Sequence, residues 1–582
     1  MVLTSSNATT PQLLILEFGM TALAIATSFA WPGLGRGFFR WAERWFMQLA
    51  RRKGLAVATV GLSVIVLRLA LLPLFPIPLP FVPDDFSFLL ACNTFLSGRL
   101  ANPTPAMWTH FESIHITMQP TYMSMYFPGQ GLVLAAGKAI TGNPWFGLLI
   151  VSALMCAALC WMLQAWLPPG WALLGGFIAV MRLGVFSYWT NTYHAGGSLA
   201  ALGGALVLGG LPRLMKTAKM RYGLLAGVGI SILALTRPYE GVLMCIPVGF
   251  VLFRWLLKGA NRPKPAAAAG LVAAPLAVIL ATCAWFGFYD YRAFGNPLTP
   301  PYAVNRATYA IAPYYVWQKL RPVPVYRHKD FQAFYEMAET GFYKQIHSRK
   351  GFIPYTLLKV GFAFLFYAGF ALLPPLIMVR RVFLDRRIRF LVACVLVLAA
   401  GMVIEIFLLP HYLAPFTGAF YAIGLQAMRH LRLWKPEGRA MGLALVRFIV
   451  VVCVLMAGLR VLAEPMHFGP GEFPPSNWNF TWFGPGHWGV ERAETEKNLE
   501  NQAGEQLAIV HYSQGHQPFD EWVYNAPDID HSKVVWARDM GAEENLRLIQ
   551  YYRDRTVWLV EPDANPVRVA RYTMATTADI EK

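Results

Sequence analysis

Two adjacent carboxylates, Asp84 and Asp85, lie in residues 81–131, a stretch rich in proline and aromatic residues between two long apolar segments. A carboxylate is suited to taking the proton of a hydroxyl group while that oxygen attacks a carbon centre. Because a carboxylate at a bilayer edge is costly to place, we interpret the pair as functional. The alternative is structural, since an aspartate at the start of the helix predicted at Phe86–Leu96 would cap it. We predict that at least one aspartate is a catalytic base.

The same stretch contains Glu112 and His115, which are three residues apart. On a helix this spacing places both side chains on one face, where they would form an acid–base pair or contribute two metal ligands. Two ligands do not make a metal site, so the presence of a metal stays open. The alternative is that the pair only forms the polar face of an interfacial segment.

Two further groups have side chains suited to holding an anion or a sugar. Arg237 offers paired donors to a phosphate, although it could instead pair with Glu240 at i, i+3. His411 and Tyr412 open an apolar segment and would contact a diphosphate or a sugar, or simply be solvated.

Aromatic and proline residues around Tyr126 and Gln130 predict a turn with rings at headgroup depth, either for substrate contact or for anchoring. Arg292 begins the loop 291–352, which is rich in aromatic residues and long for a connection without a function.

Apolar residues make up 56% of the 582 residues and charged residues only 14%, with a mean hydropathy of +0.42. Soluble domains carry about a quarter charged residues, so most of this chain is expected to face lipid or other apolar helices. Runs of about 20 apolar residues predict membrane-spanning helices. Twelve spans are predicted, at 12–31, 55–80, 143–166, 171–189, 192–211, 222–237, 239–257, 267–290, 353–379, 389–409, 411–428 and 441–462.

The net charge of +18 comes from basic residues in the short loops between these spans. This is the pattern that orients membrane proteins, and it argues against nucleic acid as a partner. With the basic loops in the cytoplasm, all the candidate residues named above, the loop 291–352 and everything after residue 463 fall on the extracytoplasmic side. Arg182 and Glu405 lie within spans without an assigned role, and an internal pair between them is one option.

The C-terminal region changes character after a linker at 465–488. The segments QLAIVHYS, KVVWARD and TVWLVEPD predict buried strands, with a helix at GAEENLRLIQYYRD. We therefore predict three units. Residues 1–53 form an extra spanning helix and a basic cytoplasmic loop, 54–462 a transmembrane catalytic domain, and 463–582 a small extracytoplasmic α/β domain.

The sequence resembles the GT-C superfamily of integral-membrane glycosyltransferases. It is most similar to the bacterial branch related to protein mannosyltransferases, aminoarabinose transferases and RgtA/B/C/D-type enzymes. The resemblance rests on PDDFSFLLACNTFLSGRL, on QPTYMSMYFPGQGLVLA and on HYLAPFTGAFYAIG, and it covers about residues 55–430. It implies a mainly α fold, a polytopic membrane helical bundle with interfacial helices in the first extracytoplasmic loop, in the inner membrane of a bacterium.

The resemblance also implies a reaction. A sugar would pass from a polyprenyl-phosphate donor to an extracytoplasmic acceptor with inversion, and an acidic residue of the first loop would be the base, for which we prefer Asp85 over Asp84. Many relatives have arginine at the position of His411, so the phosphate contact made there stays open for the histidine. Many also read Lys-Tyr-Pro-Pro where this chain has Met125–Pro128, which removes one possible phosphate-binding cation. No cofactor is firmly indicated, and a divalent cation remains one option.

Two other functions stay open. A polytopic lipid or glycan transporter or flippase without transferase activity would have ionisable residues near mid-span and inverted repeats. A ligase that uses a lipid-diphosphate donor would share the transferase chemistry. The transferase reading requires that Asp84 and Asp85 face a hollow that contains a cation and opens toward lipid.

Overall fold

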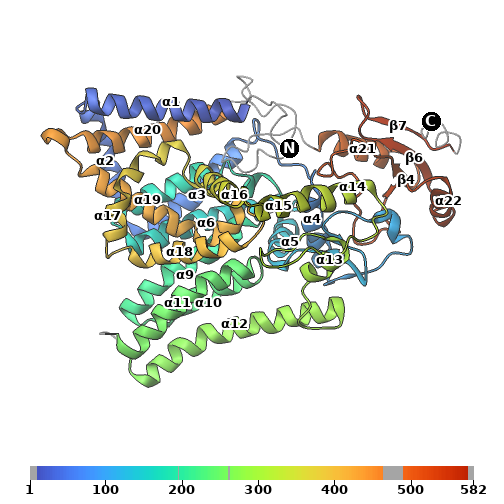
Figure 1. The fold of residues 1–582 in the computed structure, drawn as a ribbon, viewed down its shortest axis with the longest axis horizontal. Helices are drawn as coiled ribbons and strands as arrows, with labels where there is room; N and C mark the ends of the chain where they lie inside the picture. The colour runs from blue at the N-terminus through green and yellow to red at the C-terminus, as the bar shows by residue number, and fades with distance from the viewer. Residues whose placement is uncertain (1–8, 195, 260–261, 463–488, 574–582) are drawn as a thin grey trace.

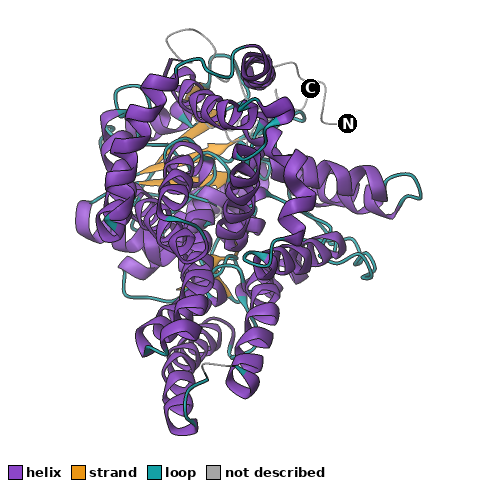
Figure 2. Ribbon diagram, turned by 90° about the vertical axis from the view of Figure 1, so that its left-hand side faces the viewer, coloured by secondary structure: helices purple, strands orange, loops and turns teal. Residues whose placement is uncertain are grey.

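Residues 9–194, 196–259, 262–462 and 489–573 are described in the computed structural model. They form a bundle of long helices with a small sheet at one end, and strands take up little of the molecule (Figures 1 and 2). The helical elements of the bundle are α1 (Thr9–Ala30), α2 (Arg36–Arg51), α3 (Lys53–Ala70), α6 (Trp145–Trp166), α7 (Pro169–Ala179), η2 (Val180–Gly184), α8 (Tyr188–Asn191), α9 (Gly197–Thr217), α10 (Met220–Ala234), α11 (Pro238–Lys258), α12 (Pro265–Phe294), α16 (Phe352–Tyr367), η4 (Phe370–Leu372), η5 (Pro374–Met378), α17 (Val379–Leu384), α18 (Arg389–Ile404), η6 (Pro410–Phe416), α19 (Thr417–Arg432), η7 (Pro436–Gly438) and α20 (Met441–Leu462).

Each predicted span overlaps one of these helices, but fewer than twelve are long spans. Within the described residues, seven helices are long and apolar enough to cross a membrane alone. An eighth span counts if α16 and the segment Phe370–Leu384, bent by 94° at their junction, are taken together. The bend has a physical reason, because Gly369 has a φ of 62° and Pro374 and Pro375 follow it. Similarly, α3 ends at Ala70 before a proline-rich segment, well short of the predicted end at residue 80.

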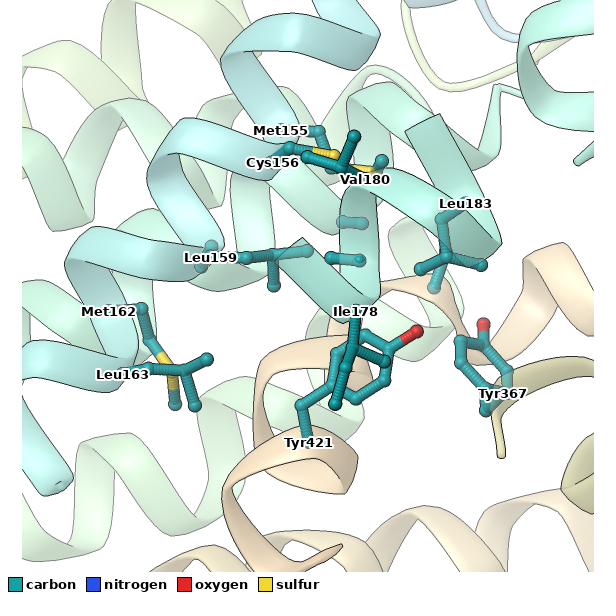
Figure 3. Close-up of a cluster of buried hydrophobic side chains, with 14 of the residues drawn as sticks. Met155, Cys156, Leu159, Met162, Leu163, Ile178, Val180, Leu183, Tyr367 and Tyr421 are labelled. Carbon is teal, nitrogen blue, oxygen red and sulfur yellow. The ribbon is translucent and has the colours of Figure 1, made fainter. Parts of the chain in front are cut away.

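The centre of the bundle is formed by α6 and α9, which have 72% of their apolar window buried. By contrast, only 6% of the α12 window is buried, and α12 lies along the outside of the bundle (Figure 1). Met155, Leu159 and Met162 recur at helical spacing on one face of α6 and contribute to the core cluster that also contains Leu183 and Tyr421 (Figure 3). The helix α6 is apolar on all sides, which is typical of a helix enclosed by other helices.

Residues 36–51, predicted as part of a basic cytoplasmic loop, form the amphipathic helix α2 instead. Its aromatic side chains Phe38, Trp41 and Trp45 are exposed, while its arginines lie between them in the sequence. Exposed aromatic rings beside basic residues are typical of a helix that lies in the membrane interface.

The buried charges inside the bundle also differ from the prediction. Arg182 pairs with Glu17 of α1 at 3.3 Å and donates to the carbonyl of Leu365. The pair with Glu405 that the sequence left open is wrong, because Lys359 of α16 reaches the backbone carbonyl of Glu405 and attracts its carboxylate. The partner of Arg182 thus comes from α1, the span that the resemblance places outside the common core.

The polar segments 81–131 and 291–352 lie between the bundle and the C-terminal sheet (Figure 1). The helix predicted at Phe86–Leu96 is present as α4, which begins at Pro83, three residues before its predicted start, while a small antiparallel sheet in the order β1-β3-β2 was not foreseen. The elements are α4 (Pro83–Leu96), β1 (Asn102–Pro103), η1 (Trp108–Phe111), β2 (Ile116–Thr117), β3 (Thr121–Ser124), α5 (Pro128–Thr141), α13 (Pro301–Tyr309), α14 (Lys329–Gln332), η3 (Ala333–Glu339) and α15 (Thr340–His347).

The C-terminal region forms a four-stranded sheet in the order β5-β4-β6-β7, and the predicted linker 465–488 lies outside the described residues. Strands β4, β5 and β6 are parallel and coincide with the three predicted strands, whereas the antiparallel β7 was not predicted. The elements are α21 (Val490–Glu500), β4 (Gln506–Val510), β5 (Val534–Arg538), α22 (Ala542–Tyr551), β6 (Thr556–Glu561) and β7 (Arg568–Arg571).

Candidate active site

Asp84 and Asp85 both lie in the first turn of α4, directly after Pro83. Proline suits this position because the helix needs no N–H there, and acidic residues are favoured where the helix dipole is positive. Consecutive residues of a helix point about 100° apart. The two carboxylates therefore face different surroundings.

Asp85 is a buried structural anchor. Its side chain is 0% exposed, and its Oδ1 accepts hydrogen bonds from the backbone N–H groups of Tyr193 and His194 at 2.9 and 3.0 Å. The Nδ1 of His194 lies 2.9 Å from the same oxygen, and the backbone N–H of Phe81 reaches Oδ2. Asp85 thereby fixes the segment between α8 and α9 against the start of α4.

Asp84 is the carboxylate that keeps contact with solvent, with 22% of its side chain exposed. Tyr126 donates its phenolic hydrogen to Oδ1, and Nδ1 of His115 lies 3.2 Å from Oδ2. The Tyr126 hydroxyl is also 3.1 Å from Nδ1 of His115, which closes a triangle of three polar groups. Each carboxylate oxygen has a second acceptor site, so Asp84 can still accept a hydrogen bond from a bound hydroxyl.

The position of His115 is set by two serines. Ser87, one turn after Asp84 on α4, donates to the backbone carbonyl of His115 at 2.7 Å, and its Oγ lies 2.8 Å from that of Ser124. Ser124 ends β3 and accepts from the backbone N–H of Tyr126. His115 itself has a left-handed backbone with a φ of 67°, which is uncommon for a non-glycine residue and indicates that the surroundings hold it there.

The surroundings of Asp84 favour its ionised form. Burial alone would raise the pKa of this carboxyl. The attraction and hydrogen bond of His115, the more distant His194 and the hydrogen bond from Tyr126 together outweigh burial and hold the pKa below its usual range. The pKa of Tyr126 is raised well above its usual value, by burial first and then by the charge of Asp84. The cluster at neutral pH is therefore a carboxylate that receives a phenol hydrogen bond.

Three further predicted site residues form a second group. Arg237 lies at the junction of α10 and α11, and His411 and Tyr412 lie in η6. The guanidinium of Arg237 lies 4.4 Å from the ring centre of Tyr412. The neighbouring His411 holds the hydroxyl of Tyr188 at 2.7 Å from its Nδ1. Tyr188 also stacks against His194, the residue that contacts Asp85. Glu240 is close enough to interact with the charge of Arg237, so their predicted pairing stays open.

Aromatic rings connect the two groups. The ring of Tyr302 lies 6.1 Å from that of Tyr126 and 5.3 Å from that of Tyr314. Tyr302 and Tyr412 are both near enough to Tyr126 to raise the pKa of its hydroxyl further. On the far side of Tyr314 lies Arg306, whose guanidinium is 4.9 Å from the ring and pairs with Glu339 at 2.5 Å. Asp84 and Arg237 thus belong to one polar, aromatic-lined region.

Three of the predicted site residues, Glu112, Gln130 and Arg292, lie outside these two groups. Glu112 and His115 do not share a helical face, because η1 ends at Phe111, and Glu112 instead contacts Tyr309 and His328 at 2.9 and 3.2 Å. Gln130 donates to the carbonyl of Tyr193 and so supports the segment held by Asp85. Arg292 is exposed, with its guanidinium over Phe288 of its own helix, and is not brought to the cluster.

No group of three metal-ligating side chains is found in the part of the chain that the structure describes. The pair Glu112 and His115, considered for joint ligation, is separated into two clusters. Sequence reasoning missed Ser87, Tyr188, His194 and Arg306, which are polar residues of ordinary type in apolar or aromatic surroundings. One signal was available, since polar side chains buried at a membrane edge need partners.

No protein-family model and no curated protein matches the sequence. Solved structures are similar over most of the chain. ArnT from Cupriavidus metallidurans in the apo state has a TM-score of 0.48 at 11% identity, covering 86% of this chain and 92% of that one. The same protein bound to undecaprenyl phosphate gives 0.47 at 13%, covering 88% and 92%.

The oligosaccharyltransferase of Archaeoglobus fulgidus, tethered to an acceptor peptide, gives a TM-score of 0.44 at 12% identity, covering 89% of this chain and 69% of that one. The similarity concerns the overall path of the chain, and the residue roles proposed below rest on side-chain geometry.

Proposed function

We propose that this protein is a membrane glycosyltransferase that moves a sugar from a polyprenyl-phosphate donor to a hydroxyl-bearing extracytoplasmic acceptor. The observation that carries the proposal is the cluster of Asp84, His115 and Tyr126, an ionised and partly exposed carboxylate at the end of apolar helices. The motif resemblance over residues 55–430 supports the donor class. The same motifs favour a bacterial inner membrane with the cluster on its outer side.

Asp84 is the general base in this proposal. The acceptor hydroxyl gives its proton to the Asp84 carboxylate while its oxygen forms a bond to the anomeric carbon. The bond between that carbon and the donor phosphate oxygen breaks, so a single displacement inverts the anomeric centre. His115 and Tyr126 hold the carboxylate in place and keep it ionised.

Geometry favours Asp84 over Asp85, the residue preferred from sequence. The Asp85 carboxylate is fully enclosed and occupied by donors from residues 193–194 and 81, which leaves no room for an acceptor. Asp84 has exposed surface and unused acceptor sites on both oxygens. We assign Asp85 the role of holding the site together.

The leaving phosphate is assigned to Arg237. A guanidinium offers two parallel donors to phosphate oxygens, and stacking on Tyr412 holds its plane. Preorganised cations stabilise the negative charge that develops as the sugar leaves. Tyr302, whose ring stacks with Phe127 and Tyr314, lies between Tyr126 and the Arg237 side of the region and lines the place proposed for the sugar.

Transfer of a radiolabelled sugar from polyprenyl-phosphate donors tests this assignment in purified, reconstituted protein. We expect Asp84→Asn to lower kcat by about 100-fold or more, as for loss of a general base. Arg237→Gln is expected to raise KM for the donor and lower kcat together. Arg292→Gln is the matched control, because its exposed guanidinium lies outside the cluster, and its activity should stay near wild type.

Two results would contradict the proposal. Full transfer by Asp84→Asn would remove the base from this position. If wild type transfers no sugar from any donor of a panel but carries labelled lipid across vesicles, the transporter function replaces the transferase.

A further inference from the structure

A cavity of 470 Å³ lies between the ends of four bundle helices, away from the Asp84 cluster. Its wall comes from the start of α3, the ends of α6 and α9, and the start of α10. The lining side chains used below are Lys53, Trp161, Gln164, Arg213, Lys216 and Tyr222.

The cavity and the Asp84 cluster lie at opposite ends of the same helices. The chain leaves α3 at Ala70 toward α4, and it enters α9 at Gly197 just after the segment held by Asp85. The cavity is lined by the other ends of these helices, at Lys53 and at residues 212–217. Under the predicted topology this is the cytoplasmic edge of the membrane.

The cavity is strongly cationic. Lys53, Arg213 and Lys216 contribute three positive charges, and the described lining residues include no carboxylate. Arg213 is held rigidly, since it donates to the carbonyls of Gly209 and Trp161 and stacks on the Trp161 ring at 4.1 Å. Both lysines are exposed at their ends, so their ammonium groups are free to meet a ligand from the membrane surface.

The wall of the cavity has both polar and apolar surface, which suits a ligand that is part polar and part apolar. Gln164 donates to the carbonyl of Lys53 at 3.0 Å and ties α3 to α6. Trp161 and Val57 add apolar surface to the same wall. Only Arg52 separates Lys53 from α2, whose exposed aromatic residues suit a place in the membrane interface. The cavity therefore lies at headgroup depth.

We propose that this cavity binds the phosphate headgroup of an anionic phospholipid. Basic pockets between membrane helices at the cytoplasmic face suit such headgroups, with ammonium groups attracting the charge and apolar walls receiving the glycerol region. The site is separate from the proposed sugar transfer and goes beyond it. A free phosphate ion shares the charge but would make no use of the apolar wall.

The test is native mass spectrometry of purified full-length protein titrated with phosphatidylglycerol and, in parallel, with phosphatidylcholine. We expect wild type to retain phosphatidylglycerol in preference to phosphatidylcholine. The double variant Lys53→Gln and Lys216→Gln should bind phosphatidylglycerol about tenfold or more weakly, since each basic residue near the surface contributes about fivefold. Lys258→Gln with Lys435→Gln is the matched control, with the same charge change outside the cavity.

Four outcomes are informative. Weakened binding in the cavity variant alone supports the headgroup site. Equal loss in the control variant, or unchanged binding in the cavity variant, overturns it. Displacement of phosphatidylglycerol by millimolar inorganic phosphate identifies a free phosphate site and also overturns the lipid assignment. Sugar transfer is not part of this readout, so failure of the proposed function leaves the result intact.

Discussion

Asp84 and Asp85 are consecutive on the first turn of α4, yet their carboxylates bond to different parts of the chain. Asp85 is enclosed by the backbone of Tyr193 and His194, and Asp84 receives Tyr126 and His115. A single helical turn thereby joins the segment before α9 to the loop that follows β3. Asp84, the proposed base, is thus held in position by its buried neighbour Asp85.

This difference in surroundings predicts that replacing the two aspartates will lower thermal stability to different extents. Asp85→Asn should lower the midpoint of thermal unfolding in detergent more than Asp84→Asn does. An amide in place of the carboxylate cannot accept from all of its present donors, and hydrogen bonds to a charged group contribute about 1.5–3 kcal/mol each. Glu500→Gln at an exposed helix end is the control. Equal midpoints for the two aspartate variants would contradict the anchoring role.

The hydrogen bond from Tyr126 predicts a shift in pH dependence. Activity that needs ionised Asp84 is present above its pKa and is lost as pH falls through it. Tyr126→Phe removes one of the groups that lower this pKa, so the acidic limb of the kcat/KM profile should move to higher pH. An unmoved acidic limb with reduced kcat would show that Tyr126 acts on the substrate instead of on Asp84.

A buried ionic cluster joins the C-terminal sheet to the loops of the site. Arg538, at the end of β5, pairs with Asp330 at 2.7 Å and with Glu521 at 2.8 Å, and it donates to the carbonyl of Glu112. Arg538→Gln leaves two buried carboxylates without their cation, which typically costs about 3–5 kcal/mol. We expect faster hydrogen exchange in both β5 and residues 108–117. The exposed Arg547→Gln, in a surface pair with Glu543, should leave exchange unchanged.

A histidine–aspartate pair in the C-terminal sheet predicts pH-dependent stability. The hydrogen bond that His511 donates to Asp539 raises the pKa of His511, so its contribution to stability is complete below the unfolded value near 6.5 and is lost as pH rises through the folded pKa. The pKa of Asp539 is lowered despite its burial, so its part is present above about 4. His511→Gln should therefore lower the unfolding midpoint more at about pH 5.5 than at about pH 8.5. The opposite order would exclude the pair.

Prediction from the sequence succeeded where the signal is local. The apolar runs placed a helix in each of the twelve predicted spans, and the strand patterns placed β4, β5 and β6. The predicted start of α4 lies three residues after the observed one, because Pro83 and the two aspartates belong to its first turn. The predicted helical face of Glu112 and His115 failed since spacing alone does not decide whether a loop is helical.

By itself the sequence determined which segments are apolar, where the chain turns polar and which residue types are able to do chemistry. These properties follow from side-chain transfer energies and backbone preferences, which act within a few residues. Only the tertiary structure decided that Asp84 meets His115 and Tyr126 while Asp85 is closed off, and that Arg182 pairs with Glu17 and not with Glu405. Such choices depend on which distant segments pack together, and that is set by the competition of all buried groups for partners.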